Sequence, residues 1–263
     1  MNLDPQPLLP PLKWAGGKRW LVPYLMPIWQ KYSSRRLVEP FCGGLAVTLG
    51  LLPKRGLLND INPHLVNFYR QLKSGLTFDI QMENDSDLFY RQRERFNALI
   101  KEQKHKTSEA AQLFYYLNRT CFNGLCRFNK SGFYNVPFGC YKTINYKEDF
   151  LEFKPLFANW DFQCGGFNQL NIIPDDFIYA DPPYDVEFTQ YSAGGFNWDE
   201  QILLAHWLKE HSGPVVLSNQ LTPRIEELYS DLGFNITILD APRRISCTGD
   251  RKPAKEVLAT LNL

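Results

Sequence analysis

Short apolar runs and amphipathic stretches alternate along this chain. The apolar runs are rich in leucine, valine, isoleucine and aromatic residues and are bounded by glycine, proline or acidic residues, which is typical of buried strands in a parallel sheet. Four runs are predicted to form such strands, at residues 37–39, 56–60, 177–180 and 215–219. Two later runs, at residues 234–239 and 256–261, alternate in polarity and are predicted to close the sheet as antiparallel strands.

The stretches between these runs carry helical periodicity. Helices are predicted at residues 18–28, 45–52, 63–73, 108–117 and 222–229, and one more begins after Asn197. Asn197 and Glu200 fit a capping box for that last helix. Its buried side is expected to carry Leu203, Leu204, Trp207 and Leu208. Strands that alternate with helices predict an α/β fold of the dinucleotide-binding type.

The segment Asp181-Pro182-Pro183-Tyr184 directly follows the predicted strand 177–180. Proline lacks an N–H group and fixes φ, so the strand cannot continue, and the segment is expected at the carboxyl edge of the sheet, where α/β folds bind ligands. A carboxylate, a free carbonyl group and an aromatic face at one rigid point suit a planar amine. Taken alone, the tetrapeptide also fits a common Asp-Pro turn followed by a packing tyrosine.

Two glycine-containing turns are candidates for binding a second ligand. Gly16 and Gly17 precede a predicted helix, as in anion-binding turns, although a simple turn before a helix has the same pattern. The strand ending at Glu39 leads into Phe41-Cys42-Gly43-Gly44, and the next strand ends at Asp60. An acid at that position can accept hydrogen bonds from ribose hydroxyls. The alternative role for Asp60 is capping the helix at 63–73.

Composition limits the class of protein. The chain has 263 residues, of which 44% are hydrophobic and 22% are charged, as in a soluble globular protein. No apolar run reaches the length of a membrane span, and the first residues lack the pattern of a secretion signal. The six cysteines form no Cys-x-x-Cys pair and the four histidines do not cluster with them, so no metal site is expected. Scattered cysteines favour a reducing cytoplasm.

Residues 89–146 differ from the rest of the chain because basic and aromatic residues dominate there. The first part is predicted to be helical, and residues 118–146 are predicted to form loops or a hairpin. Basic charge with interleaved aromatic residues is typical of a nucleic-acid interface. The charge alone fits a solvated helical face equally well. The loop Cys121-Phe122-Asn123-Gly124-Leu125-Cys126-Arg127-Phe128-Asn129 favours nucleic acid, because Asn and Arg pair with adenine and guanine edges.

These motifs resemble, in their order, those of the Dam-type DNA adenine-N6 methyltransferases, the D12 class or alpha group. The resemblance covers nearly the whole chain. Its most specific elements are Leu12-Lys13-Trp14-Ala15-Gly16-Gly17-Lys18 and Asp181-Pro182-Pro183-Tyr184. One departure is Leu45, since many relatives carry a further glycine there. The tail 244–249 also matches only loosely.

The resemblance implies an α/β, Rossmann-like S-adenosylmethionine-dependent methyltransferase sheet with an inserted, mainly helical DNA-recognition domain. The expected boundaries are 1–68 and 151–263 for the two parts of the methyltransferase domain and 69–150 for the target-recognition domain. The implied cofactor-binding residues are Trp14, Ala15, Gly16, Lys18, Glu39, Phe41, Gly43, Asp60 and Asp181. The implied DNA-binding residues are Phe122, Asn123, Leu125, Arg127, Asn129 and Pro137, and members with this loop recognise GATC.

The expected reaction is transfer of a methyl group from S-adenosylmethionine to adenine N6 in duplex DNA. The base lies inside the stack and must be flipped out to be reached. Asp181 and the Pro182 carbonyl are expected to accept the amine hydrogens, and Tyr184 to stack on the base. No metal and no membrane are involved. We expect a monomer in the cytoplasm, and a companion restriction endonuclease is left open.

Two alternatives remain at this point. A methyltransferase acting on an RNA base or on a protein amide would need the same acceptors for a planar amine. A DNA-binding module that has lost catalysis would keep the basic segment.

Overall fold

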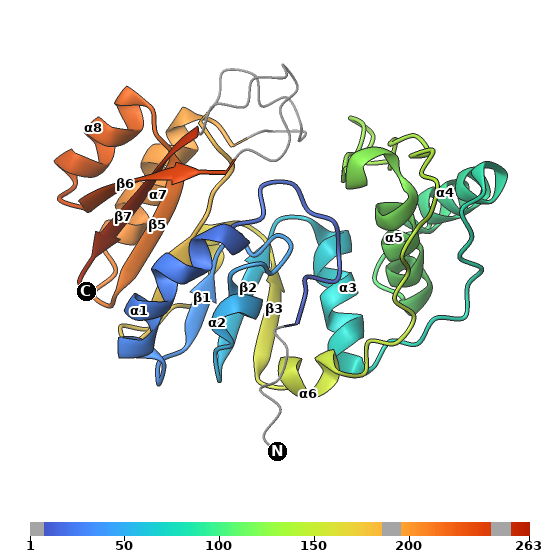
Figure 1. Cartoon of the computed structure of the whole chain (residues 1–263), viewed down its shortest axis with the longest axis horizontal. Helices are drawn as coiled ribbons and strands as arrows, with labels where there is room; N and C mark the ends of the chain where they lie inside the picture. Colours follow the sequence, from blue (N-terminus) through green and yellow to red (C-terminus); the bar gives the residue numbers. More distant parts are fainter. Residues whose placement is uncertain (1–7, 186–195, 243–253) are drawn as a thin grey trace.

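The chain forms one mixed sheet with helices on both faces and a helical segment at one end (Figure 1). The computed structural model describes residues 8–185, 196–242 and 254–263. The strand order is β3-β2-β1-β4-β5-β7-β6. The strands are β1 (Leu37–Glu39), β2 (Gly56–Asp60), β3 (Trp160–Cys164), β4 (Phe177–Ala180), β5 (Val215–Gln220), β6 (Asn235–Ala241) and β7 (Ala254–Leu261). The α/β fold class predicted from the sequence is therefore confirmed.

The first five strands in this order pair in parallel, whereas β7 runs antiparallel to both β5 and β6. Short apolar strands suit this centre because parallel strands are covered on both faces. The alternation along β4 shows the two faces. Phe177 and Tyr179 belong to the apolar cluster under helix α1 (Val22–Tyr32), and Ile178 and Ala180 belong to the cluster under α7 (Trp198–Lys209) and α8 (Pro223–Asp231).

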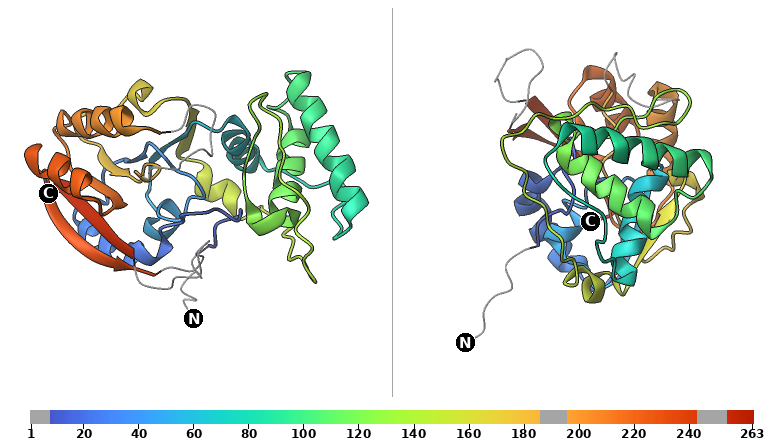
Figure 2. Two further views of the ribbon diagram at one scale, coloured as in Figure 1. Left: turned by 90° about the horizontal axis from the view of Figure 1, so that it is seen from above. Right: turned by 90° about the vertical axis from the view of Figure 1, so that its right-hand side faces the viewer.

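The remaining helices complete the covering layers and the helical end of the molecule. They are α2 (Thr48–Leu51), α3 (Pro63–Ser74), α4 (Ser86–Lys101), α5 (Ser108–Thr120) and α6 (Phe153–Phe157), with short 3-10 turns at η1 (Arg19–Leu21), η2 (Phe122–Gly124) and η3 (Phe167–Gln169). Helices α4 and α5 lie beside the sheet rather than on it (Figures 1 and 2). A third apolar cluster joins them to α3, because it includes Phe68 on α3, Phe96 on α4 and Phe114 on α5.

Four expectations about elements need correction. The helix expected at 45–52 begins only at Thr48, because Leu45 has a positive φ of 60°. Leu203 is 49% exposed, and Gln201 and Ala205 share the buried side of α7 with Leu204 and Leu208. Strand β3 and helix α6 were not expected. The N-cap of α3 is Asn62, whose side chain accepts from His64 N and Leu65 N, so Asp60 is not the cap.

Candidate active site

The candidate site lies where the parallel strands end at one edge of the sheet. Glu39 and Asp60 are the last residues of β1 and β2, and Asp181 directly follows β4. Chain order reverses between β1 and β4, because β1 has β2 on one side and β4 on the other. Such a reversal leaves a crevice at the carboxyl ends of the strands, where ligands bind in open α/β sheets.

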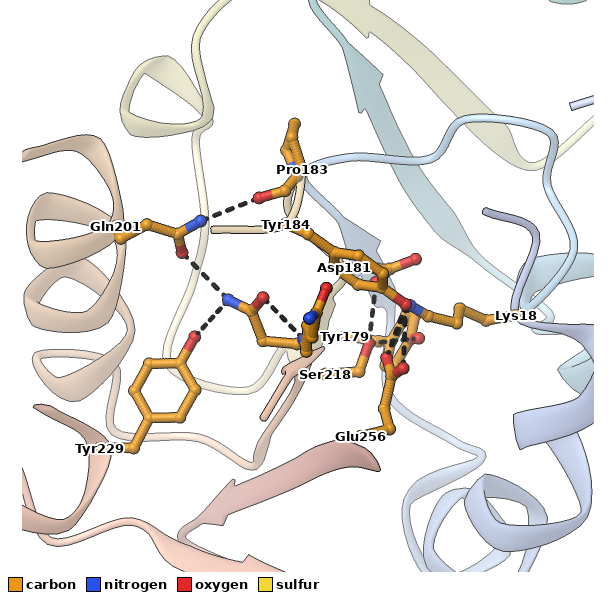
Figure 3. A network of polar contacts seen from close by, with 11 residues as sticks. Lys18, Tyr179, Asp181, Pro183, Tyr184, Gln201, Ser218, Tyr229 and Glu256 are labelled. Carbon is orange, nitrogen blue, oxygen red and sulfur yellow. Dashed lines mark hydrogen bonds and ion pairs between the residues drawn. The ribbon is translucent and has the colours of Figure 1, made fainter. Parts of the chain in front are cut away.

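A buried lysine organises the polar groups at this edge (Figure 3). Lys18 Nζ lies 2.8 Å from Asp181 Oδ1, 2.7 Å from Tyr184 Oη and 2.7 Å from Glu256 Oε1. The Tyr184 hydroxyl also donates to Glu256 Oε2 at 2.9 Å. The side chains of Lys18 and Glu256 are 3% and 2% exposed, whereas that of Asp181 is 21% exposed. Asp181 is therefore more accessible to solvent than Lys18 and Glu256.

Asp181 is fixed from a second direction by strand β5. Ser218 Oγ donates to Asp181 Oδ1 at 3.0 Å, and the Tyr179 and Ser218 hydroxyls lie 2.9 Å apart. Both donors to Asp181, Lys18 and Ser218, bind the same oxygen, Oδ1. These two hydrogen bonds therefore fix the orientation of the carboxylate.

Burial and charge shift the pKa values of this network. Burial alone would lower the pKa of Lys18, but Asp181 and Glu256 outweigh it and raise that pKa above its usual range. Burial raises the pKa of Asp181, and Lys18 and Ser218 oppose the rise. Burial likewise raises the pKa of Glu256 against the opposing effect of Lys18. The lysine therefore stays charged and holds in place two carboxylates, the buried one of Glu256 and the partly exposed one of Asp181.

The Asp60 carboxylate links the turns that follow β1 and β2, because it accepts hydrogen bonds from a backbone N–H group in each turn. Its Oδ2 accepts from Gly43 N at 3.1 Å and its Oδ1 accepts from Asn62 N at 2.9 Å. Burial raises the pKa of Asp60 to about 6, although these backbone N–H groups oppose the rise. The Tyr69 hydroxyl donates to Gly43 O at 2.6 Å, so the glycine turn is fixed on both sides.

The two predicted glycine turns pack directly on each other. A Cβ atom on Gly43 would lie 2.8 Å from Trp14 Nε1, and one on Gly44 would lie 2.7 Å from Trp14 Cβ. Only glycine permits this approach. Phe41 continues the aromatic lining, since its ring lies 5.7 Å from that of Phe167 and 5.4 Å from that of Phe196. The predicted residues Trp14 and Gly43 thus lie in contact, and Phe41, two residues before Gly43, packs on Phe167 and Phe196.

Glu39 carries an unsatisfied polar atom at the end of β1. Its side chain is 3% exposed, and Oε1 finds no hydrogen-bond partner among the residues that the structure describes. Burial raises its pKa to about 8. A buried acceptor without a donor is a place where a ligand that brings a cation or an N–H group would bind favourably.

Ala15 and Gly16 differ from the other predicted cofactor residues because both are exposed, and nothing lies within 4 Å of a Cβ added to Gly16. They occupy the outer part of the first turn, between Trp14 and Lys18. Their exposed backbone is accessible to a ligand.

The predicted recognition loop forms an irregular hairpin next to the N-terminal turn. Isolated bridges pair Cys121 with Phe138 and Phe128 with Tyr134. Asn118, near the end of α5, accepts from Lys13 N at 2.8 Å and donates to Lys13 O at 2.8 Å, and it also donates to Gly124 O at 3.3 Å, which attaches α5 and the loop to the segment that carries Trp14. The predicted DNA-binding and cofactor-binding residues therefore lie on connected segments.

Within the hairpin, the predicted DNA-binding residues differ in exposure. Phe122, Asn123, Asn129 and Pro137 are exposed, and Leu125 and Arg127 are half-buried. Arg127 Nε donates to Asn135 Oδ1 at 2.9 Å, so the arginine is held by a neighbour across the hairpin. Asn129 Oδ1 accepts from Ser131 N and Phe133 N and shapes the turn at the tip.

Glu256 and Ser218 belong to the network but were not among the residues predicted from the sequence. An acid inside the apolar run of β7 was the available signal for Glu256, since isolated charges in buried strands need partners. The residues 186–195 and the basic cluster at 243–253, including the tail 244–249, lie outside the described residues.

The part of the chain that the structure describes contains neither a candidate metal site nor a candidate membrane-spanning helix. Among residues 8–185, 196–242 and 254–263, no group of three or more His, Cys, Asp and Glu side chains is arranged to hold a metal ion. In the same part of the chain, no helix has the length and hydropathy needed to cross a membrane.

Comparison with known proteins gives a consistent result. Residues 14–245 match the family described as D12 class N6 adenine-specific DNA methyltransferase. The chain is 36% identical over 271 residues to a DNA adenine methylase of Vibrio cholerae, and the alignment covers 94% of each protein. It is 34% identical over 259 residues to the type II methyltransferase M1.LlaDCHI of Lactococcus lactis, covering 90% of this chain and 89% of that protein.

A third relative is longer than this chain. The DNA N-6-adenine-methyltransferase of Escherichia phage P1 is 36% identical over 270 residues, which cover 95% of this chain but 35% of the phage protein. The chain thus spans about a third of the length of that relative.

Proposed function

Because the chain belongs to the family of D12 class N6 adenine-specific DNA methyltransferases, we propose that it methylates adenine N6 within GATC sites of duplex DNA, with S-adenosylmethionine as the methyl donor. Family membership supports DNA adenine as the substrate over an RNA base or a protein amide. The observation that carries the proposal is the 21% exposed Asp181 carboxylate, fixed by Lys18 and Ser218 at the reversal of strand order.

The residues at the strand ends fit the proposed cofactor. The unpartnered Glu39 Oε1 would accept from its ammonium group, and Asp60, whose oxygens are fixed by Gly43 N and Asn62 N, would accept from its ribose hydroxyls. Trp14 and Phe41 would supply apolar contacts, with Ala15, Gly16 and Gly43 as backbone neighbours. Bound there, S-adenosylmethionine supplies an activated methyl group, so the protein needs to provide position rather than a nucleophile or a metal.

Asp181, Pro182 and Tyr184 are the proposed catalytic residues. The target adenine would have to leave the stack, at a cost of a few kcal/mol. Asp181 and the Pro182 carbonyl would accept the two N6 hydrogens and direct the nitrogen lone pair toward the methyl group. Lys18 Nζ lies 2.7 Å from the Tyr184 hydroxyl and 4.4 Å from the centroid of its ring, so the lysine fixes the hydroxyl end of the ring. We propose that the flipped base stacks on a face of this ring. Holding the reactants in line supplies most of the rate enhancement.

Residues 69–150 are proposed to form the target-recognition domain. Asn123, Leu125, Arg127 and Pro137 would read bases, Asn129 would shape the loop, and Phe122 would lie near the flipped adenine. Asn123 has a positive φ of 54° and is exposed at the start of the hairpin. The proposal includes action as a monomer in the cytoplasm, and a companion endonuclease stays a prediction.

Transfer of a tritiated methyl group tests the proposal. The substrates are duplexes with GATC, duplexes with each single-base change in that site, RNA and protein. We expect label only on duplex DNA and mainly on GATC. Label on every duplex at equal rates would contradict the GATC assignment, and label on RNA or protein alone would contradict the substrate class.

The same assay tests Asp181. Asp181→Ala should lower the transfer rate about 100-fold or more while duplex binding survives, because phosphate contacts supply most DNA affinity. Asp175→Ala is the matched control, because Asp175 is a 66% exposed carboxylate that precedes the same strand. An Asp181→Ala enzyme as active as the control would show that Asp181 has no catalytic role.

A further inference from the structure

The catalytic loop has an unusual shortage of its own hydrogen-bond donors. Pro182 and Pro183 both lack an N–H group, so the backbone between Asp181 and Tyr184 cannot be fixed by the usual donation to a neighbouring carbonyl. Side-chain donors from other elements must take this role. The position of the Pro182 carbonyl, which the proposed function uses, depends on how its neighbours in this loop are held.

One such donor is a buried glutamine on helix α7. Gln201 is 1% exposed, and its Nε2 donates to Pro183 O at 2.8 Å (Figure 3). Its Oε1 accepts from Asn219 Nδ2 at 3.1 Å. The same Asn219 Nδ2 lies 3.0 Å from the Tyr229 hydroxyl, and Asn219 Oδ1 accepts from Gln220 N at 2.9 Å.

Each bond in this chain of contacts fixes the next group. Asn219 presents its amide nitrogen to Gln201 because its oxygen is already bonded to the backbone of Gln220. Gln201 must then present its oxygen to Asn219 and its nitrogen to Pro183. Asn219 and Tyr229 are 0% and 1% exposed, so water does not compete for the bonds that Asn219 makes with Gln201 and Tyr229.

This chain of hydrogen-bonded side chains lies in apolar surroundings. It crosses the apolar cluster that contains Leu204, Leu217 and Ile225, and buried amides destabilise a core when they lose a partner. Here Asn219 donates both to the Tyr229 hydroxyl and to Gln201, and Gln201 in turn donates to the carbonyl of the second loop proline.

We propose that Gln201, oriented by Asn219 and Tyr229, is a positioning residue for methyl transfer that fixes the Pro182-Pro183 backbone for the target amine. This inference rests on the proposed function of the site. It assigns to α7 and β5 a part in the reaction that none of the predicted site residues covers.

Gln201→Met tests the proposal, because methionine has a similar volume but neither donates nor accepts as an amide. Trp29→Phe is the matched control. Trp29 is also buried on a helix and its Nε1 donates to a backbone carbonyl, Leu51 O, at 3.1 Å, but it lies on α1, away from the catalytic loop. Each variant removes a buried side-chain donor to a backbone carbonyl, so both should lose thermal stability.

The expected difference is in turnover. With saturating duplex and S-adenosylmethionine, Gln201→Met should lower kcat about 10- to 100-fold, because a small misplacement of reacting groups costs that much. The dissociation constants for both ligands should stay near those of wild type. Trp29→Phe should keep the wild-type kcat. Equal kcat values for the two variants would overturn the positioning role.

Two further variants keep the test decisive if Gln201→Met does not fold. Asn219→Asp is isosteric but turns an acceptor toward Gln201, which would rotate the glutamine amide and place its oxygen against Pro183 O. Tyr229→Phe removes one hydroxyl and should lower kcat by about two- to fivefold, as expected for one neutral hydrogen bond. Unchanged kcat in both would overturn the inference. Absence of transfer by the wild-type protein would instead contradict the proposed function itself.

Discussion

Leu45 has a backbone conformation that destabilises the folded protein and a buried side chain that stabilises it. Its φ of 60° lies in the left-handed region, which costs an L-residue roughly 1–2 kcal/mol. Its side chain is 0% exposed and packs in the largest aromatic cluster. Burial of the leucine therefore offsets a backbone conformation that glycine adopts without cost.

Paired substitutions separate the two effects. Leu45→Ala and Leu45→Gly both remove the buried side chain, but only glycine relieves the left-handed conformation. Glycine should therefore be the more stable of the two by about 1 kcal/mol, a reversal of the order in ordinary helices and strands. Urea unfolding of both variants measures the difference, and an alanine variant more stable than the glycine variant would contradict it.

Glu39 is expected to make the free protein less stable as pH rises. Its pKa is about 8 in the folded protein and about 4.3 in an unfolded chain, so between these values the folded state binds more protons. The free energy of unfolding then falls with rising pH through this window. Glu39→Gln removes this contribution, so the variant should gain stability relative to wild type from pH 5 to pH 9.

Denaturant unfolding at several pH values, without cofactor, checks the Glu39 prediction. The difference between variant and wild type isolates Glu39 from Asp60, whose pKa is also raised. A stability difference that does not change with pH would show that Glu39 is ionised in the folded protein throughout.

At the scale of elements, the contact between two turns defines the candidate cofactor site. The turn before η1 contributes Trp14, and the turn after β1 contributes Gly43 and Gly44. Hydrogen bonds of Gly43 with Asp60 and Tyr69 hold the second turn, and the contact of the indole with the glycines sets the spacing between the two turns.

Gly44→Ala should disturb that spacing, because its Cβ would lie 2.7 Å from Trp14 Cβ. Overpacking of this kind costs roughly 1–3 kcal/mol, and cofactor affinity should fall with it. Gly17→Ala is the control, since a Cβ there would meet nothing closer than 3.7 Å. Calorimetric titration with S-adenosylmethionine compares the two, and equal dissociation constants would contradict the role of the turn contact.

The central strands could be predicted from the sequence because each is a continuous apolar run with a clear end. Strand β3 could not, because Trp160-Asp161-Phe162-Gln163-Cys164 is an edge strand with only two buried side chains. The helix periodicity of α7 identified Leu204 and Leu208 correctly but not Leu203, which lies just outside the buried stripe. Glu256 was missed because strand register, which sequence does not specify, brings it beside Lys18.

At the scale of the whole molecule, the proposed recognition segment, residues 69–150, shares its apolar core with helix α3. The rings of Phe68 on α3 and Tyr115 on α5 stack with centroids 5.8 Å apart, and those of His64 and Phe128 stack at 4.8 Å. Asn67 Nδ2 also donates to Thr107 O at 3.0 Å. Helix α3 thus packs on the sheet with one side and on α5 with the other.

An isolated fragment 69–150 should consequently not fold, because it lacks His64, Asn67 and Phe68. A fragment 61–159, which keeps α3, should show more helical circular dichroism and better dispersed amide resonances. Cooperative thermal unfolding of fragment 69–150 would contradict the shared core.

Helix α3 also determines how this enzyme can be recombined with its relatives. A chimera joined at residue 69 would pack the native Phe68 against aromatic side chains of the other protein. The volumes of these side chains would not match those of the native ones. Junctions after Asp60 and before Trp160 instead move α3 together with α4, α5 and α6 and cut the chain at strand ends. The transferable module for altering sequence specificity therefore begins one helix earlier than the change in composition indicates.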